Sequence, residues 1–438
     1  MPVMDIEIHL LGYWHKCAEV ALSSPTGTSR RGGVILRYDD VYASEHLYQA
    51  DHQALSVNYP VDLQWRTLGN WPAFLIDLLP QGAAHRRLQR QSAQPLTEWE
   101  LLGQGALNPV GNLRVGNAAR EFPPCHPGFT LADMLERGDA FIDHAHAVGA
   151  TVAGATDTQG EAPKFWVVQD RTGAWHPDDG EFGGNAQRHA LLKFPVPEAG
   201  PRALEMLRAE AAYQRVARAV QLRVTPQLPQ FIGGKALLVP RFDRRVENGS
   251  EIRLGVESLY SIARVLDADT SLQHHTILIE LSKHLTDFPA DLLEYIRRDI
   301  LNIALGNRDN HGRNTAVLKE TDGTMRLAPL YDVGPAFLDA RSLARRIRWD
   351  GEEPGRQIDW MRVLANLHTH FEEAGAARPR PPVQTPNLET TALALKSFAT
   401  AVYELPLLMR QCGVEDSIVE ARAEACRQMA APLDAIQI

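Results

Sequence analysis

Three side chains stand at spacings that suit the transfer of a phosphoryl group. Asp309 and Asn314 are five residues apart, and Asp332 opens an Asp-x-Gly triplet further along the chain. Such a reaction needs a carboxylate that accepts the proton of the attacking hydroxyl, and magnesium prefers hard oxygen ligands. Each piece alone also fits a polar loop, a capping aspartate or an ordinary turn. The ordered set, however, predicts a phosphoryl-transfer site.

A predicted helix and a predicted hairpin hold these side chains. Apolar residues at 292, 293, 296, 300, 303 and 304 share one face of a helix over 290–305. Asp287 and Pro289 suit the start of this helix. The helix leads into the segment 306–314, and a hairpin with an Asp-Gly turn connects this segment to Asp332.

Ahead of this helix, the order of elements is that of the N-terminal lobe of a protein kinase. Strand signals at 165–168 and 189–195 precede a predicted helix over 204–220. Two apolar runs joined by Gly233-Gly234 then predict a hairpin. This order predicts two lobes, with a hinge that begins after the hairpin.

Candidate nucleotide-binding residues follow from this order. Lys193 lies on the strand signal 189–195, where kinases place a lysine against the nucleotide phosphates, and Glu210 on the next helix is its predicted partner. The Gly-rich stretch 149–160 could fold its amides over phosphates. Backbone groups of Pro240 and Phe242 could address an adenine. Taken singly, a solvent-directed lysine, an exposed glutamate and a plain surface loop are the commoner explanations.

Composition narrows the classes of function. The net charge of −9 disfavours global binding to nucleic acid. Four cysteines far apart argue against a disulfide framework and a cysteine-based zinc site, and favour a reducing compartment. No segment is long and apolar enough to span a bilayer, and the opening residues lack the pattern of a secretion signal. We therefore expect a cytoplasmic globular protein.

Two other groups of side chains are interpreted as surface features. The arginines at 341, 345, 346 and 348 predict a solvated helical face. The pair His274-His275 and the residues His368 and His370 stand at spacings that suit a metal ion. No carboxylate-histidine set completes a site around them in the sequence, so surface histidines are the prediction.

These motifs resemble those of the HipA family of bacterial toxin kinases. The segments 306–314 and 327–332 resemble its two most specific C-terminal motifs, and 241–245 resembles its hinge. Near the N-terminus, 74–82 and 108–113 resemble a helix and a closing strand of the family. The likeness is strongest to the HipH/YjjJ-like branch.

The resemblance implies an α+β fold of the bilobal protein-kinase type, with a β-rich N-lobe, an all-helical C-lobe and a small α/β N-terminal subdomain. The expected domains are the N-terminal subdomain 1–122, the N-lobe with glycine-rich loop and hinge 150–245, and the C-lobe with catalytic and magnesium loops 246–438. Prolines at 123, 124 and 127 mark the expected linker.

The resemblance also implies a role for each matching residue. Asp309 is the expected proton acceptor, and Asn314 and Asp332 are the expected magnesium ligands. Lys193 is expected at the phosphates, with Glu210 as its partner. The remaining expected contacts with ATP are Gln159, Gly160, Glu161, Lys164, Pro240, Arg241, Phe242, His311, Arg313, Asn314, Tyr331 and Asp332.

Family members phosphorylate serine on translation components, with an aminoacyl-tRNA synthetase as the known type of target. A small helix-turn-helix antitoxin neutralises them and brings them to operator DNA. The resemblance therefore implies a serine/threonine protein kinase of a type II toxin-antitoxin system. It also implies a HipB-like partner, contact with DNA only through that partner, and no contact with a membrane.

One position departs from the family pattern. Asp157 stands where many members carry a serine that is autophosphorylated. An aspartate has about one negative charge against roughly two for a phosphate. Either its charge holds the loop partly ejected, or Thr156 or Thr158 takes the phosphate instead.

Two other functions stay open at the level of sequence. Asp309, His311 and Asn314 could form a metal-bound hydrolytic cluster, as in a deoxyribonuclease toxin. A nuclease, however, has no need for Lys193 and a hinge. A catalytically weak regulator that binds an antitoxin is supported only by Asp157.

Overall fold

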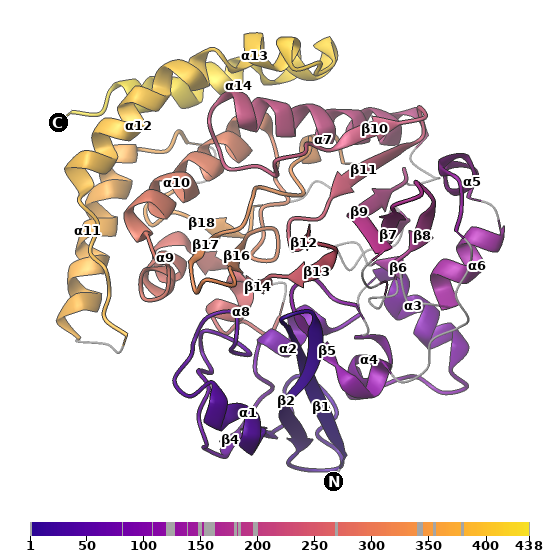
Figure 1. Cartoon of the computed structure of the whole chain (residues 1–438). Coiled ribbons are helices and arrows are strands. Elements are labelled where there is room, and N and C mark those ends of the chain that lie inside the picture. Colours follow the sequence, from indigo (N-terminus) through magenta and orange to yellow (C-terminus); the bar gives the residue numbers. More distant parts are fainter. Residues whose placement is uncertain are drawn as a thin grey trace. The chain divides into compact units, whose positions relative to one another are not determined.

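The computed structural model divides the chain into two compact units (Figure 1). The first comprises Met1–Ala203, Pro229–Leu266 and Leu318–Gly323, and the second comprises Leu204–Leu228, Asp267–Val317 and Thr324–Ile438. The structure describes all residues except 1, 81, 107, 120–127, 138, 148–150, 153–162, 179–181, 183–184, 196–199, 268–269, 340–344, 354–355, 378–380 and 438. The domain boundaries expected from the sequence stay predictions.

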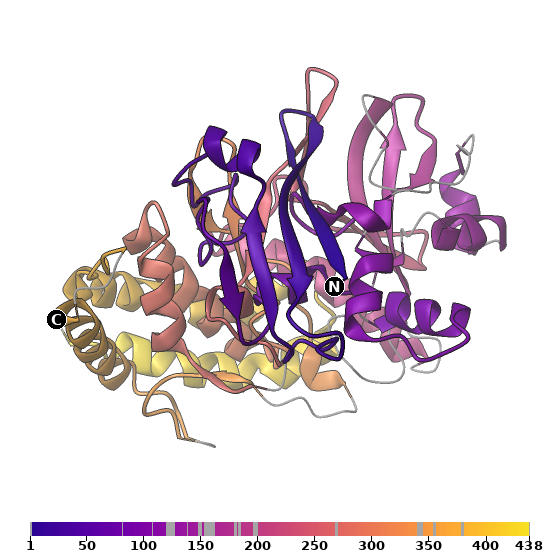
Figure 2. The same cartoon turned by 90° about the horizontal axis from the view of Figure 1, so that it is seen from below.

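The first unit opens with a five-stranded sheet, whose long strands β1 and β2 are drawn in indigo in Figures 1 and 2. Its strands are β1 (Val3–Leu10), β2 (Tyr13–Leu22), β3 (Val34–Tyr38), β4 (Arg66–Leu68) and β5 (Leu113–Val115), in the order β4-β3-β2-β1-β5. Apolar residues alternate along β1, so that Ile6 and Ile8 are fully buried in the core of this sheet.

The first unit also contains short helices. They are α1 (Asp40–Glu45), α2 (Phe74–Leu78), α3 (Gly82–Gln91), α4 (Glu98–Gly105), the 3-10 helix η1 (Gly116–Ala119), α5 (Leu131–Glu136), α6 (Asp139–Ala147) and α8 (Leu259–Ile262). Capping boxes start α4 at Thr97 and α5 at Thr130. Within the segment 74–82, which resembles a helix of the family, α2 ends at Leu78, because Leu79 precedes a proline and adopts an extended backbone.

A second antiparallel sheet confirms the predicted strands of the N-lobe. It contains β6 (Thr151–Val152), β7 (Lys164–Asp170), β8 (Trp175–Pro177), β9 (Ala186–Lys193), β10 (Gln230–Ile232) and β11 (Ala236–Pro240). The order is β10-β11-β9-β7-β6, with β8 paired to β7. The Gly233-Gly234 turn joins β10 to β11, as expected, and both glycines have positive φ. After β11 the unit continues as β12 (Arg244–Glu247), β13 (Ser250–Arg253) and β14 (Gly255–Ser258).

Helices dominate the second unit. They are α7 (Pro201–Ala219), α9 (His274–Ser282), α10 (Phe288–Leu305), the 3-10 helix η4 (Ala336–Leu338), α11 (Trp360–Ala376), α12 (Leu388–Tyr403), α13 (Leu405–Gln411) and α14 (Asp416–Asp434). The helices α12 and α14 lie side by side (Figure 1). Among the described residues no single helix has the length and apolar character needed to cross a membrane, although the pair α12 and α13, bent by 56°, passes this test when taken together.

The predicted helix that leads to Asp309 is α10. The side chain of Asp287 accepts a hydrogen bond from the Ala290 amide at 3.2 Å, and Pro289 lies in the first turn, as the sequence indicated. Next come β16 (Ala316–Lys319) and β17 (Met325–Leu327), the strands of the predicted hairpin. The sequence did not predict the parallel pair of β15 (Leu272–Gln273) and β18 (Ile347–Arg348), because two-residue strands carry no periodic signal.

Candidate active site

The chain leaves α10 at a glycine that no other residue can replace without strain. Gly306 has φ +74°, and a Cβ atom at this position would lie 2.6 Å from Cδ1 of Phe337. The backbone amide of Phe337 donates to the Gly306 carbonyl at 3.1 Å. This close contact fixes where the loop 307–314, here called the catalytic loop, begins.

Asp309 and Asn314 are brought together inside the catalytic loop. The side-chain amide nitrogen of Asn314 donates to the backbone carbonyl of Asp309 at 2.7 Å. Because the nitrogen faces this carbonyl, the Oδ1 atom of Asn314 points the opposite way, as an acceptor for a donor or a cation. The side chain of Asp309 is 25% exposed, so its carboxylate can be reached by a substrate.

His311 lies next to Asp309 as a neutral ring. Burial lowers the pKa of His311 to about 4, and the opposing effect of the Asp332 carboxylate is smaller. Its Nδ1 atom accepts from the backbone amide of Arg313 at 3.2 Å, which puts the proton of the neutral ring on Nε2. This Nε2 atom is 3.7 Å from Oδ1 of Asp309. The ring therefore presents an N–H group towards the predicted proton acceptor.

The segment with Asp332 is tied to the same loop. The hydroxyl of Tyr331 donates to the carbonyl of Arg313 at 2.6 Å. Asp332 adopts the left-handed conformation with φ +54°, which few residues other than glycine adopt without strain. The structure thus gathers the predicted residues Asp309, His311, Arg313, Asn314, Tyr331 and Asp332 in one region of the second unit.

Helix α7 runs along this segment. The side chain of Gln214 donates to the carbonyl of Leu330 at 3.0 Å. Glu210 lies one turn earlier on the same helix face, and a Cβ atom placed on Gly334 would lie 3.9 Å from the Cβ atom of Glu210. Glu210 is therefore beside the Asp-x-Gly turn. Its pairing with Lys193, which belongs to the first unit, stays a prediction.

The catalytic loop is supported by a residue that the sequence did not predict as part of the site. Asp299 of α10 is buried and accepts hydrogen bonds from the side chains of Asn310 at 2.8 Å, Arg345 at 2.8 Å and Trp349 at 2.7 Å. Burial opposes its ionisation, but the Arg345 guanidinium, the neighbouring His274 and the Trp349 indole hold the pKa of Asp299 below its ordinary value. A charged residue within the apolar face of a predicted helix was the available signal.

This contact corrects the interpretation of the arginine group at 341–348. Arg345 lies outside any helix and is largely buried between the carboxylates of Asp299 and Glu352. It supports the fold rather than a solvated helical face. Arg348 belongs to the short strand β18, and Arg341 lies outside the described residues.

In the first unit, Lys193 ends strand β9 and is buried. It pairs in register with Lys164 of β7 on one side and with Leu237 of β11 on the other. The sheet therefore places the two predicted phosphate-binding lysines on neighbouring strands. The predicted loop residues Gln159, Gly160 and Glu161 lie outside the described residues, as does the segment 156–158.

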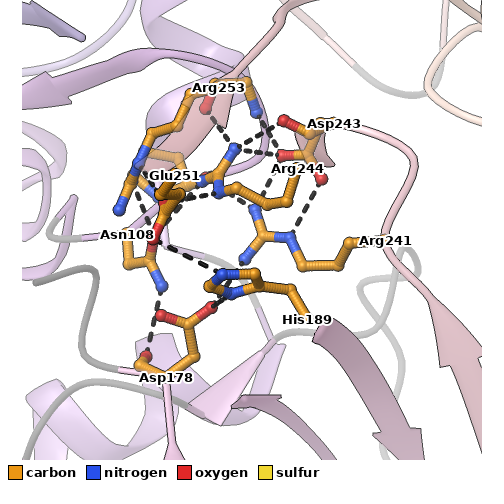
Figure 3. A network of polar contacts seen from close by, with 10 residues as sticks. Asn108, Asp178, His189, Arg241, Asp243, Arg244, Glu251 and Arg253 are labelled. Carbon is orange, nitrogen blue, oxygen red and sulfur yellow. Dashed lines mark hydrogen bonds and ion pairs between the residues drawn. The ribbon is translucent and has the colours of Figure 1, made fainter. Parts of the chain in front are cut away.

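The predicted hinge follows β11 and rests on a buried network of charges (Figure 3). The carboxylate of Asp243 accepts from Arg241 at 2.7 Å, from Arg244 at 2.6 Å and from the backbone amide of Gly111 at 2.9 Å. Burial alone would raise the pKa of Asp243, but the two guanidinium groups hold it well below its ordinary value. The backbone amide of Arg241 donates to the carbonyl of His189 at 3.0 Å.

Further members extend this network across the first unit. Asp178 accepts from His189 at 2.8 Å, and Glu251 forms an ion pair with Arg253 at 2.7 Å. Asn108 accepts from Arg253 at 3.1 Å and donates to the carbonyl of Asp178 at 3.2 Å (Figure 3).

Arg241, one of the expected ATP contacts, belongs to this network. Its guanidinium lies over the ring of Trp166 at 4.0 Å and forms ion pairs with Asp243 and Asp178. The side chain is thus occupied inside the protein. Within the expected adenine site 240–242, any contribution of Arg241 would come from its backbone carbonyl.

Comparison with known proteins first defines the class of fold. A solved structure described as the Shewanella oneidensis toxin-antitoxin system HipA, HipB and its operator DNA complex matches with a TM-score of 0.67. The match covers 98% of this chain and 96% of that chain, at 15% sequence identity. The likeness shows a shared α+β kinase-like fold, and the fold class predicted from the sequence is confirmed.

The family follows from the sequence itself. The model of the family described as HipA-like C-terminal domain matches residues 155–394, which is more than half of the chain. The chain therefore belongs to the HipA family, and the predicted resemblance is confirmed. A relative from Sinorhizobium fredii, named "Putative kinase Y4mE", is 32% identical over 166 residues, which span 35% of this chain and 38% of that relative.

Proposed function

We propose that this chain is an ATP- and magnesium-dependent serine/threonine protein kinase of the HipA type. The observation that carries the proposal is the joined pair of loops in the second unit. Asn314 faces Asp309 through its amide nitrogen, and Tyr331 ties the segment of Asp332 to the same loop. A carboxylate with solvent access and two hard oxygen donors thus stand together in the order that phosphoryl transfer requires.

The donor set fits magnesium. The amide oxygen of Asn314 and the carboxylate of Asp332 are oxygen ligands of the kind that magnesium prefers. When bound, magnesium with ATP would supply an activated phosphoryl group and neutralise its charge. Neither side chain is a sulfur or nitrogen ligand, so the pair shows no preference for a softer metal.

Each other residue then has a defined task. Asp309 accepts the proton of the serine or threonine hydroxyl, and the neutral His311 positions its carboxylate. His311, Arg313 and Tyr331 line the nucleotide on the side of the catalytic loop. Lys164 and Lys193 offer positive charge to the phosphates, and Glu210 orients Lys193. The backbone of 240–242 binds the adenine. Residues 159–161 cover the phosphates.

The family gives the wider role. The solved relative is a complex of HipA with HipB and operator DNA. By analogy we place this chain in a type II toxin-antitoxin system in the cytoplasm, with a HipB-like helix-turn-helix antitoxin as its partner. In that assembly DNA is reached through the antitoxin. A translation component such as an aminoacyl-tRNA synthetase is the proposed class of protein substrate.

The test compares wild type and Asp309→Asn in a bacterial lysate with γ-labelled ATP and magnesium. We expect the variant to transfer label about 10²- to 10⁴-fold more slowly, because the proton acceptor is lost. Removal of magnesium with EDTA should stop transfer by the wild type. Asp416→Asn is the matched control, because this exposed carboxylate pairs only with the surface residue Arg410 in the described structure.

Two results would contradict the proposal. One is unchanged label transfer by Asp309→Asn in a folded protein. The other is nicking of plasmid DNA by the wild type without ATP, which would favour the nuclease. ATP binding without turnover would instead identify the weak regulator.

A further inference from the structure

We propose that His275, Asp350 and His370 form a binding site for a divalent transition-metal ion such as Zn²⁺ or Ni²⁺. One donor atom from each of these side chains lies within 4.8 Å of the other two. The three residues belong to the second unit and share none of the proposed magnesium or nucleotide ligands. The proposal is independent of kinase activity.

The parallel strand pair β15 and β18 brings two of these residues together. Gln273 pairs in register with Arg348, and each chain then continues for two residues, to His275 and to Asp350. Because the strands are parallel, the two side chains leave the pair at the same end. His275 lies in the first turn of α9, so its backbone is fixed by helical hydrogen bonds as well.

Helix α11 supplies the third residue. The side chain of Asn366 donates to the backbone carbonyl of Asp350 at 3.3 Å. His370 stands one turn further along the same helix face, and its Nε2 atom is 2.9 Å from Oδ2 of Asp350. Three separate segments of the chain therefore each provide one donor side chain. For this reason no single motif in the sequence indicates the group.

The two imidazole rings are in direct contact. Their centroids are 3.7 Å apart, with an angle of 12° between the ring planes. The Nδ1 atom of His275 is buried and has no hydrogen-bond partner among the residues that the structure describes. A neutral imidazole keeps a lone pair on one ring nitrogen, which is available to a ligand.

A hydrogen bond between His370 and Asp350 would by itself account for only part of this arrangement. It leaves the buried Nδ1 atom of His275 without a hydrogen-bond partner in the described structure. It also leaves the stacked rings of His275 and His370 without a polar contact to each other. A cation resolves both points, because it takes a lone pair from each ring and is balanced by the carboxylate. Two histidines and one carboxylate are a usual donor set for zinc and its neighbours in the first transition row.

The rings must tilt to share an ion. Ring lone pairs lie in the ring plane, and a zinc ion sits about 2.0–2.1 Å from each nitrogen, so parallel rings do not point at one position. The side chain of His370 is 26% exposed and that of Asp350 is 47% exposed. Both can therefore turn towards an ion without opening the core, and water can fill the remaining coordination positions.

The test titrates Zn²⁺ and Ni²⁺ into the full-length chain after treatment with EDTA and its removal. We expect one ion bound per chain by calorimetry, together with a higher melting temperature, because an ion that binds only the folded state stabilises it. His370→Ala and Asp350→Asn should each weaken binding at least about tenfold, as loss of a ligand removes a direct bond. Co²⁺ provides a second readout, since its visible absorption reports the ligands rather than the fold.

The chain offers a matched control on the same helix. The ring of His368 is 50% exposed and faces Glu372 at 3.3 Å. His368→Ala should keep the affinity and stoichiometry of the wild type. The proposal is overturned if the wild type binds none of these ions, or if a folded His370→Ala variant binds them as tightly as the wild type does. Label transfer in the kinase assay decides neither result, so the two proposals can fail separately.

Discussion

Two buried carboxylates support the two halves of the proposed nucleotide machinery, and they do so differently. Asp299 supports the catalytic loop in the second unit, where it accepts from one guanidinium, one amide and one indole. Asp243 supports the hinge in the first unit, where it accepts from two guanidinium groups and one backbone amide. Asp299 forms one ion pair and otherwise accepts from neutral donors, whereas Asp243 is part of the buried network of charges.

This difference indicates what each support is for. The network around the hinge contains three arginines and three carboxylates in the described structure. Their charges balance one another, so none of these side chains is available to bind a ligand. Around Asp299, the neutral donor Asn310 belongs to the catalytic loop itself. We infer that the network fixes the hinge as a rigid backbone, whereas Asp299 holds the catalytic loop through Asn310, the residue next to Asp309.

The largest expected loss of stability comes from breaking the buried network of charges at the hinge. Asp243→Ala leaves the guanidinium groups of Arg241 and Arg244 buried against each other without their shared carboxylate. We expect it to lower the free energy of unfolding by about 4–5 kcal/mol, the upper range for a broken buried ion pair. Urea unfolding measures this loss.

Lys235→Ala is the control for that variant. It removes an exposed ion pair with Glu136 in the same unit and should cost less than about 0.5 kcal/mol. A loss below about 2 kcal/mol for Asp243→Ala would show that the hinge arginines find other partners, and the contrast with the catalytic loop would disappear.

A smaller loss of stability is expected below the catalytic loop. Asp299→Ala removes one of the two carboxylates that pair with Arg345, and Glu352 still neutralises part of the charge of this arginine. We expect a loss of about 3 kcal/mol, with faster amide hydrogen exchange in residues 309–314 because Asn310 is released. If stability falls but exchange in this loop stays unchanged, Asp299 supports the helix and not the loop.

The third prediction concerns the pH dependence of the first unit. Burial, followed by the charges of Arg253, Arg244 and Arg114, lowers the pKa of His9 from 6.5 to about 3. His15 on β2 acts in the same direction. Below about pH 6.5 the unfolded chain therefore binds a proton at His9 that the folded chain does not bind. The free energy of unfolding consequently decreases as the pH falls from about 6.5 towards about 3.

The matching variant is His9→Gln, which has no titrating ring. Its free energy of unfolding should depend less on pH, with a difference in slope of up to about 1.4 kcal/mol per pH unit below 6.5. Urea unfolding at about pH 7, 6 and 5 measures the slope. Equal slopes for the two proteins would mean that burial and the neighbouring arginines do not suppress the protonation of His9.

The sequence predicted the parts whose signals are local. Helix α10, its cap at Asp287 and the loop to Asn314 follow from spacing within about thirty residues, and the structure places them as expected. The strands β7, β9, β10 and β11 likewise follow from apolar runs and a Gly-Gly turn. Alternation and turn chemistry act between neighbours, so they can be recognised without the fold.

The supporting residues could not be predicted in this way. The partners of Asp243 come from Gly111 and from arginines beside it, and those arginines in turn reach residues as distant as Asn108 and Asp178. Arg345 looked like part of a solvated charge run because its partner, Asp299, lies 46 residues earlier. Such contacts are decided by tertiary packing, which no periodic pattern records.

The parallel pair β15–β18 has a topological consequence. It joins Leu272 to Ile347 and so closes a loop of chain that contains α9, α10, the catalytic loop and Asp332. Closing a loop of this length costs roughly 4 kcal/mol of chain entropy, which the two short strands must overcome with help from packing. We therefore expect the pair to form late during folding. A cross-link between β15 and β18 would therefore close the whole loop from Leu272 to Ile347 without contacting any of the proposed site residues within it.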